Sequence, residues 1–285
     1  MGRQENVEVF EDTEKWVKEN SFLKDAVENS TKNQKIILEN EKYISDEERN
    51  ELLQKYEEPA EVIVSKKRSY EAAGAYEGQK IMVHNFASST TPGGGVVKGS
   101  GAQEECLCRC STLYFSLNTK EMWDGFYAPH RAENNPKHND DIIYTPDVYV
   151  IKSDTANPER LSEDEFYKVN VLTCAAPNLR LMPTNRWNEA DGKKPIKLPD
   201  TELLAIHEKK MRRILDVSMK EGNEVLILGA FGCGAYQNNP EVVARALKTA
   251  VKDYLHAFKT IEFAVYVRPG DDSNFRIFER NMKGI

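Results

Sequence analysis

The residues best suited to chemistry lie in one glycine-rich stretch, PGGGVVKGSGAQEE, at residues 92–105. Three consecutive glycines, Gly93 to Gly95, leave the backbone bare, so a ligand can approach main-chain N–H groups that a Cβ atom would shield. The stretch ends in Glu104 and Glu105 at the expected start of a helix, where unpaired N–H groups favour a phosphate. Two carboxyl groups beside an anion site indicate acid–base chemistry on a phosphorylated ligand.

A second glycine-rich stretch, GAFGCGAY, occupies residues 229–236 and follows the apolar run Val225–Leu228. It leads into a predicted helix with Pro240 in its first turn and an asparagine as its cap. Neither stretch matches a dinucleotide-binding or Walker A pattern. Ligands of open α/β sheets bind at the carboxyl ends of strands, so two such loops predict a clamp around one diphosphate.

Two further residues near these loops are candidates for sugar contacts. Asn85 closes the apolar run before the first loop, and its amide can both donate to and accept from sugar hydroxyls. Tyr236 ends the second loop, and its ring is suited to stacking on a sugar or a base. The structural alternatives are a turn or cap for Asn85 and a packed aromatic ring for Tyr236.

The five cysteines do not form a metal-binding pattern. Cys106, Cys108 and Cys110 are spaced by two, which places the middle residue on a different helix face, and no C-x-x-C pair occurs. We therefore expect small buried thiols and no metal or cofactor. An odd number of cysteines without a secretory signal favours reduced thiols in the cytoplasm.

The composition excludes several classes of protein. The chain has 285 residues, 40% of them hydrophobic, and a formal net charge of −7 from 39 basic and 46 acidic side chains. This charge disfavours bulk binding to nucleic acid, which needs a basic surface. An anionic ligand must then be held locally by backbone dipoles. No apolar run reaches about 18 residues, so no membrane span is predicted.

The spacing of apolar runs predicts an α/β fold. Short apolar segments alternate with helical patterns, which indicates a three-layer α/β/α sandwich with a central sheet. The expected strands are Val62–Val64, Ile81–Phe86, Ile142–Ile151, Val169–Ala175, Val225–Ala230 and Ile261–Val267. The expected helices are Glu104–Leu117, Leu203–Lys220 and Glu241–Phe258.

The composition of the remaining segments predicts an N-terminal helical extension and two surface loops. Residues 1–60 are highly charged and are expected to form a helical extension packed on a core of residues 61–285; a free solvated arm is the alternative. Within them, Asp12 or Thr13 is expected to cap a short helix ending near Asn20, and Ser45 to begin a capping box. Residues 126–141 and 181–199 are polar and rich in proline and asparagine, which indicates surface loops.

The two glycine-rich stretches together resemble those of the bacterial-type poly(ADP-ribose) glycohydrolases. The family signature is three glycines, a spacer of six to eight residues and then Gln-Glu-Glu; here the spacer has seven residues. The match extends to the segments at residues 85–87, 108–114, 144–148, 173–178 and 229–236, and it spans about residues 5–270. The resemblance implies a macrodomain fold with a mixed central sheet, in agreement with the pattern of apolar runs.

The resemblance also implies an activity and a set of site residues. The family hydrolyses the ribose–ribose O-glycosidic bonds of poly(ADP-ribose) and releases ADP-ribose. By motif, Glu105 is the expected catalytic acid/base, Glu104 orients the sugar and Gln103 positions the loop or the ligand. The expected substrate-binding residues are Asn85, Gly93, Gly94, Gly95, Val96, Gln103, Gly232, Cys233, Gly234, Ala235 and Tyr236. The expected partner is ADP-ribose, its polymer or an ADP-ribosylated macromolecule, bound by a monomer.

The adjacency of the two glutamates constrains the mechanism. Adjacent helical residues point about 100° apart, so they cannot face each other across a bond as the carboxylates of ordinary glycosidases do. We expect one carboxyl to perform both proton transfers, and Glu105 to be protonated when a diphosphate is bound. Two alternatives keep the pocket: a hydrolase that removes ADP-ribose from protein or nucleic acid, and a non-catalytic ADP-ribose reader. First-turn charge that complements the helix dipole is the structural alternative for the glutamates.

Overall fold

The computed structural model describes residues 2–186 and 190–285. Its centre is one seven-stranded sheet in the order β1-β4-β5-β3-β6-β7-β2. The strands are β1 (Lys35–Ile37), β2 (Glu61–Ser65), β3 (Ile81–Phe86), β4 (Ile142–Val150), β5 (Tyr167–Cys174), β6 (Val225–Leu228) and β7 (Thr260–Ala264). Strands β2, β3, β5, β6 and β7 run parallel, whereas β4 is antiparallel to both of its neighbours. The expected mixed sheet is confirmed.

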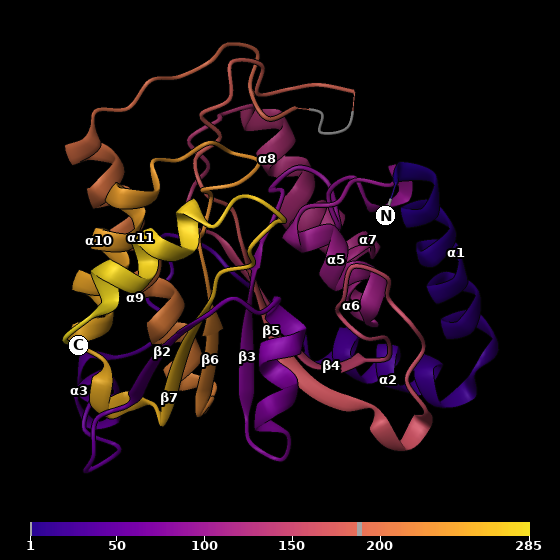
Figure 1. Cartoon of the computed structure of the whole chain (residues 1–285), viewed down its shortest axis with the longest axis horizontal. Coiled ribbons are helices and arrows are strands. Elements are labelled where there is room, and N and C mark those ends of the chain that lie inside the picture. The colour runs from indigo at the N-terminus through magenta and orange to yellow at the C-terminus, as the bar shows by residue number, and fades with distance from the viewer. Residues whose placement is uncertain (1, 187–189) are drawn as a thin grey trace.

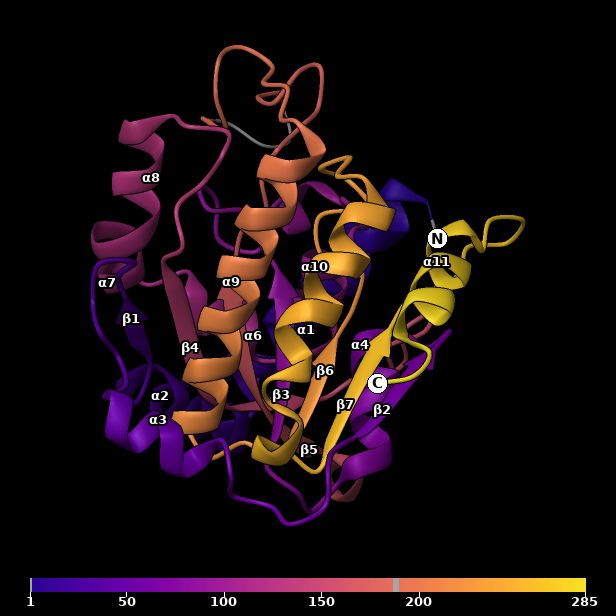
Figure 2. The same cartoon turned by 90° about the vertical axis from the view of Figure 1, so that its left-hand side faces the viewer.

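Helices cover both faces of this sheet, which gives three layers (Figure 1). One layer contains α9 (Asp200–Lys220), α10 (Pro240–Lys252) and α11 (Ser273–Met282), which Figure 2 shows in front of the strands. The other layer contains α4 (Ser69–Ala73), α5 (Gln103–Cys110), α6 (Leu113–Leu117), α7 (Lys120–Met122) and α8 (Ala128–Glu133), with α1 (Arg3–Glu19) and α2 (Ser21–Lys32) outside them. The remaining helix, α3 (Asp46–Leu52), contacts α9.

The two faces of the sheet bury separate apolar clusters because successive strand residues point to opposite sides. On β3, Met82 packs into the cluster beneath α9 and α10, whereas Ile81 and Val83 pack into the cluster beneath α4 and α5. All three side chains are almost fully buried. A central strand of this kind appears in the sequence as a continuous apolar run, which is why the sequence predicted β3 with its observed bounds.

Several predicted bounds are wrong, and packing explains them. The helix expected at Glu104–Leu117 breaks at Ser111, which is extended and bridges to Val150 of β4. The helix expected to reach Phe258 ends at Lys252. The short helix expected near Asp12 begins at Arg3 instead, so Thr13 lies in its interior, where its hydroxyl donates to the Arg109 carbonyl.

The charged segment 1–60 is not entirely helical. Lys35–Ile37 forms the edge strand β1, which pairs antiparallel with β4 and buries Ile37 in the core. Three residues are too few for a detectable alternating pattern. The predicted cap is present: the Ser45 hydroxyl accepts from the Glu48 N–H and begins α3.

The two stretches expected to be surface loops are only partly so. In 126–141, α8 forms and buries His130, whose ring packs 4.4 Å from that of Phe126 one turn earlier. In 181–199, the described residues form no helix or strand before Asp200, but Asp191 and Gly192 are buried. Residues 187–189 of that stretch lie outside the described part of the chain.

No helix within residues 2–186 and 190–285 is both long and apolar enough to span a bilayer.

Candidate active site

A pocket of about 950 Å³ lies at the carboxyl ends of the parallel strands. It is lined by residues that lie one or two positions after four neighbouring strands: Ala87 after β3, Ala176 after β5, Ala230 after β6 and Val265 after β7. Parallel strands end at the same edge of a sheet, so connections far apart in sequence meet there. Both glycine-rich loops contribute to its wall.

The first glycine-rich loop holds both glutamates against one point of its backbone. Gly94 has a φ of +57°, a region that favours glycine. A Cβ atom on Gly94 would lie 2.6 Å from Glu105 Oε1 and 2.9 Å from Glu104 Oε2. The loop can therefore pass beneath the two carboxyl groups only because this residue is glycine. The carboxyl groups lie near each other and not on opposite sides of a substrate.

Glu105 lines the pocket with one carboxyl oxygen engaged and one not. Its Oε1 atom accepts a hydrogen bond of 2.9 Å from the Gly95 N–H. Its Oε2 atom is buried and has no hydrogen-bond partner within the described part of the chain. A buried polar atom in this condition needs a partner, and a ligand hydroxyl or a water in the pocket can supply it.

Glu104 has a similar arrangement but a clearly perturbed acidity. Its Oε2 atom accepts from the Ser88 N–H at 2.8 Å, and its Oε1 atom has no partner among the described residues. Burial, and next the negative charge of Glu105, raise the pKa of Glu104 well above its usual value. The pair therefore retains a proton at a higher pH than an isolated glutamate would.

Gln103 fixes the start of α5 to the end of β3. Its Oε1 atom accepts from the Phe86 N–H at 2.9 Å, and its Nε2 donates to the His84 carbonyl and the Ser69 hydroxyl. Every polar atom of the side chain is used in this attachment. The side chain thereby sets where the two following glutamates emerge from the helix.

The second glycine-rich loop exposes backbone donors to the pocket. The N–H groups of Gly232, Gly234 and Ala235, all residues of the pocket wall, donate no hydrogen bond within the described part of the chain. Gly232 has a φ of +77°, and a Cβ there would lie 2.6 Å from that of Ala176. Helix α5 begins at Gln103, and its N-cap residue Ala102, also in the pocket wall, has no side chain that caps the helix N–H groups. Such paired donors suit the oxygens of a diphosphate.

The structure brings most of the predicted residues together at the pocket. Those that line it are Gly94, Gly95, Gln103, Glu104, Glu105, Gly232, Cys233, Gly234, Ala235 and Tyr236.

Three of the expected binding residues do not line the pocket, and their role in binding stays a prediction. Asn85 is fully buried behind the wall, where its amide donates to the Thr173 hydroxyl of β5. Gly93 lies against Tyr114 and Cys108, and Val96 is buried in the core beneath α5. The position of Asn85 within β3 explains this. Side chains of a strand point alternately to the two faces of the sheet, so the Asn85 side chain points to one helix layer and not beyond the strand end, where the pocket lies.

Several pocket residues carried no recognisable signal in the sequence. Arginines from distant segments reach the wall, namely Arg3, Arg68, Arg180 and Arg268. Aromatic residues after β7 line its other end, and the guanidinium of Arg68 lies 4.0 Å from the ring centre of Tyr266. Only packing brings these residues to one place, because no spacing relates them along the chain.

The cysteines form neither a disulfide nor a metal cluster in the described residues. All five are free, and no group of three His, Cys, Asp or Glu side chains in ranges 2–186 and 190–285 could hold a metal ion. Cys108 and Cys110 are buried in the core, whereas Cys106 reaches the pocket beside Arg68.

Comparisons with a family model and with solved structures both identify poly(ADP-ribose) glycohydrolases as similar proteins. The family model described as the catalytic domain of microbial-type PARG, poly(ADP-ribose) glycohydrolase, matches residues 4–153. This region contains the first glycine-rich loop and both glutamates. No protein of curated function matches at a significant level.

Solved structures match over nearly the whole chain. Poly(ADP-ribose) glycohydrolase from Thermomonospora curvata is 25% identical, covers 97% of this chain and 98% of its own, and gives a TM-score of 0.79. The same enzyme bound to the inhibitor ADP-HPD is 26% identical, with 96% and 98% covered and a TM-score of 0.77. The Deinococcus radiodurans enzyme in complex with ADP-ribose is 26% identical, with 91% and 98% covered and a TM-score of 0.75.

Proposed function

Because this chain belongs to the microbial-type poly(ADP-ribose) glycohydrolases, we propose that its pocket binds an ADP-ribose unit of poly(ADP-ribose) and that Glu105 acts on the adjoining bond. The chain is a glycosyl hydrolase of ribose–ribose O-glycosidic bonds. The geometry of the pocket supports the following proposed roles for individual residues.

The diphosphate lies between the two glycine-rich loops in this proposal. The open N–H groups of Gly232, Gly234 and Ala235 donate to its oxygens from one side, and the start of α5 faces it from the other. The backbone donors and the four arginines of the pocket wall supply positive charge locally, although the chain as a whole is acidic. Tyr236 lies against the sugar next to them. We propose that the enzyme acts as a monomer, since residues of this chain alone supply both glycine-rich loops and both glutamates.

The chemical step needs an acid and then a base at the same position. Glu105 gives its proton to the ribose oxygen that leaves, and the C–O bond to the anomeric carbon breaks as positive charge develops there. The resulting carboxylate takes a proton from a water, whose oxygen attacks the anomeric carbon. The products are ADP-ribose and a polymer shortened at that bond, and Glu105 regains its proton.

Glu104 assists in two ways. Its free Oε1 atom binds a sugar hydroxyl, and its Oε2 atom is held by the Ser88 N–H. Its raised pKa means that Glu104 keeps its proton to a higher pH than an ordinary glutamate does. The negative diphosphate then favours the protonated form further.

The observation that carries the proposal is the unpartnered Oε2 atom of Glu105 in the pocket wall, beside a loop that tolerates no side chain at Gly94. The test is Glu105→Gln, which preserves shape and removes the proton donor. We expect turnover of labelled polymer to fall at least about 100-fold, with ADP-ribose affinity by calorimetry nearly unchanged. Wild-type turnover in this variant would contradict the catalytic role of Glu105.

A second assay separates this function from its alternatives. Labelled polymer, mono-ADP-ribosylated protein and ADP-ribosylated DNA are each incubated with the enzyme, and released ADP-ribose is measured. Release from the polymer is the expected outcome. Release only from the mono-ADP-ribosylated substrates, or binding without release from any, would overturn the proposed substrate.

A further inference from the structure

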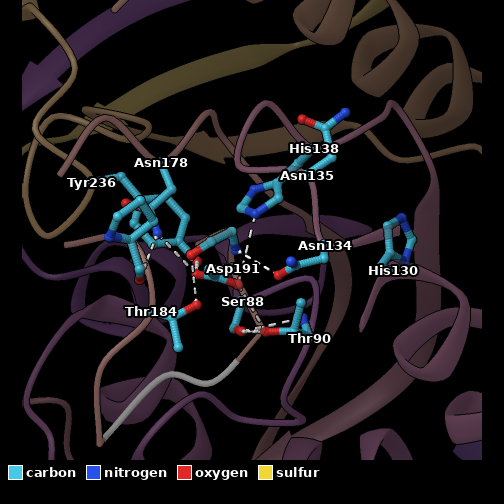
Figure 3. A network of polar contacts seen from close by, with 12 residues as sticks. Ser88, Thr90, His130, Asn134, Asn135, His138, Asn178, Thr184, Asp191 and Tyr236 are labelled. Atoms are coloured by element: carbon cyan, nitrogen blue, oxygen red, sulfur yellow. Dashed lines mark hydrogen bonds and ion pairs between the residues drawn. The ribbon is translucent and has the colours of Figure 1, made fainter. Parts of the chain in front are cut away.

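Asp191 is a fully buried carboxylate that contacts both glycine-rich loop regions without lining the pocket. It lies in the connection between β5 and α9, about which the sequence predicted only a surface loop. Figure 3 shows it at the centre of a polar network whose members come from several separate segments. Burying a carboxylate costs free energy unless it is well paired, so this position demands a set of partners.

The two oxygens of Asp191 hold different parts of the site. Oδ1 accepts from the Thr90 hydroxyl at 2.7 Å, and Thr90 lies between β3 and the first glycine-rich loop. Oδ2 accepts from the Tyr236 hydroxyl at 3.0 Å, at the end of the second loop, and from Asn178 Nδ2 at 3.0 Å after β5. One side chain therefore links connections that follow three neighbouring strands of the sheet.

A chain of hydrogen bonds continues from Asp191 to the catalytic pair. The Thr90 hydroxyl lies 3.3 Å from the Ser88 hydroxyl, which also accepts from the Thr90 N–H. The N–H of Ser88 in turn donates to Glu104 Oε2. Thr90 is held from its other side by Arg131 of α8, which donates to its carbonyl.

Nearby basic side chains favour the ionised form of Asp191 in this network. Burial opposes ionisation of Asp191, but His138, with Nε2 3.7 Å from Oδ1, and the hydrogen bonds from Thr90 and Tyr236 outweigh it and lower the pKa of Asp191. Arg180 also lies 3.7 Å from its Oδ2 atom. The carboxylate is therefore negative at neutral pH. After burial and the charge of Glu105, its charge is a further cause of the raised pKa of Glu104.

We propose that Asp191 is a positioning residue of the hydrolysis: it holds Tyr236 against the bound sugar and, through Thr90 and Ser88, holds the carboxyl group of Glu104 in its sugar-binding position. This inference rests on the proposed function. It assigns to a buried loop residue the coupling between the diphosphate clamp and the catalytic pair.

The test is Asp191→Asn, which keeps the shape and one acceptor oxygen but removes the charge. We expect kcat on polymer to fall about 10- to 100-fold, as for a displaced catalytic group, with KM changed less than about threefold. Besides Glu105 and the bound diphosphate, the titratable groups of the described residues that interact with Glu104 are Cys108 and Tyr127, and burial raises the pKa of both, so they stay neutral. Loss of the Asp191 charge lowers the pKa of Glu104, so the alkaline limb of the kcat profile should move to lower pH.

Glu262→Gln is the matched control. Glu262 is also a buried carboxylate that accepts from a tyrosine hydroxyl, that of Tyr76 at 2.6 Å, but it does not line the pocket. Both variants are expected to lose some thermal stability, and only Asp191→Asn to lose kcat and shift the pH profile. Equal effects of the two variants on kcat and on the pH profile would reduce Asp191 to a structural role.

A double-mutant cycle tests the route through Tyr236. If Asp191 acts partly by holding the tyrosine, Asp191→Asn should cost less in kcat when Tyr236→Phe is already present. Full additivity would contradict that route.

One further measurement separates this inference from the proposed function. The titration of Glu104, followed by carboxyl ¹³C NMR without substrate, should shift to lower pH in Asp191→Asn whether or not polymer is cleaved. An inactive wild-type protein with this shift would contradict the function alone. An active wild-type protein with unchanged kcat, pH profile and Glu104 titration in the variant would contradict the role of Asp191 alone.

Discussion

At the scale of single residues, the site depends on the absence of one side chain and the closeness of two others. The backbone of Gly94 occupies the space in which a Cβ atom would meet both Glu104 and Glu105. Because Gly94 has no side chain, the loop can approach the two carboxyl groups closely, and the Gly95 N–H donates a hydrogen bond to Glu105. The same crowding buries two acidic groups side by side, which is costly for the folded protein but useful for holding a proton.

Gly94→Ala should disable the site. The new Cβ would approach both carboxyl oxygens to less than 3.0 Å at a positive φ, so either the loop or the glutamates must move. We expect kcat to fall at least about 100-fold, because displacement of about 1 Å has that effect. Gly74→Ala is the control: its Cβ would meet Tyr167 at an ordinary 3.6 Å. A fully active Gly94→Ala enzyme would contradict the geometry.

Glu104→Gln should be less active but more stable than the wild type at neutral pH. The folded protein holds the Glu104 proton more tightly than the unfolded chain does, so wild-type stability declines as pH rises above the usual glutamate range. Glutamine does not titrate and avoids this loss.

Thermal unfolding from pH 5 to pH 8 measures the effect. The expected gain is roughly 1–3 kcal/mol at the upper end and shrinks toward the lower end. The control is Glu58→Gln, an exposed position where we expect almost no change. A gain that grew as pH fell would have the wrong sign.

At the scale of elements, α1 braces the first glycine-rich loop. Asn6 is buried, and its Nδ2 atom donates to the Gly99 carbonyl at 3.0 Å. The loop passes so near the helix that a Cβ on Gly99 would lie 2.1 Å from the Arg3 carbonyl oxygen. Arg109 of α5 holds the next residue by donating to the Ser100 carbonyl at 2.6 Å. The N-terminal segment therefore supports the site and does not merely cover the core.

Asn6→Ala should weaken catalysis although Asn6 does not line the pocket. Without its hydrogen bond, the segment between Gly95 and α5 gains freedom, and the Gly95 N–H is held less firmly against Glu105. We expect kcat to fall about tenfold and stability to fall by about 1 kcal/mol. Gln4→Ala on the exposed face of the same helix is the control for lost helix contacts. Equal kcat values in the two variants would exclude a bracing role.

At the scale of the whole molecule, two buried histidines lie together under the second glycine-rich loop. His84 of β3 and His207 of α9 both pack against Phe231. Burial lowers the pKa of His84 to about 3 and that of His207 to about 4. Both remain neutral in the folded protein at a pH at which the unfolded chain would bind protons. The core connecting the sheet to the second glycine-rich loop is therefore sensitive to acid.

His84→Phe should reduce the acid sensitivity of the fold. Below a pH of about 6.5 the unfolded chain binds protons that the folded protein cannot, so stability falls as pH decreases toward the lowered pKa values. Removing one of the two histidines should make the loss of stability between pH 6.5 and pH 4 shallower. Denaturant unfolding across that range measures the slope. An unchanged or steeper slope would contradict the assignment.

The sequence by itself determined the features that depend on neighbouring residues. The apolar runs predicted six of the seven strands, and the glycines followed by two glutamates predicted a loop at the pocket. Such features are readable because strand burial and bare backbone leave a pattern within a few residues. The strand β1 escaped because three edge residues carry too little pattern.

Only the tertiary structure decided which side chains share the pocket. In the folded protein, Asn85 lies behind the pocket wall, Arg3 and Arg180 line the pocket, and Asp191 is buried where it contacts the segments of both glycine-rich loops. The physical reason is that strand order and helix packing bring together segments from nearly opposite ends of the chain, such as those of Arg3 and Arg268. A polar residue in an irregular connection has the same local pattern whether it faces water or completes a buried network.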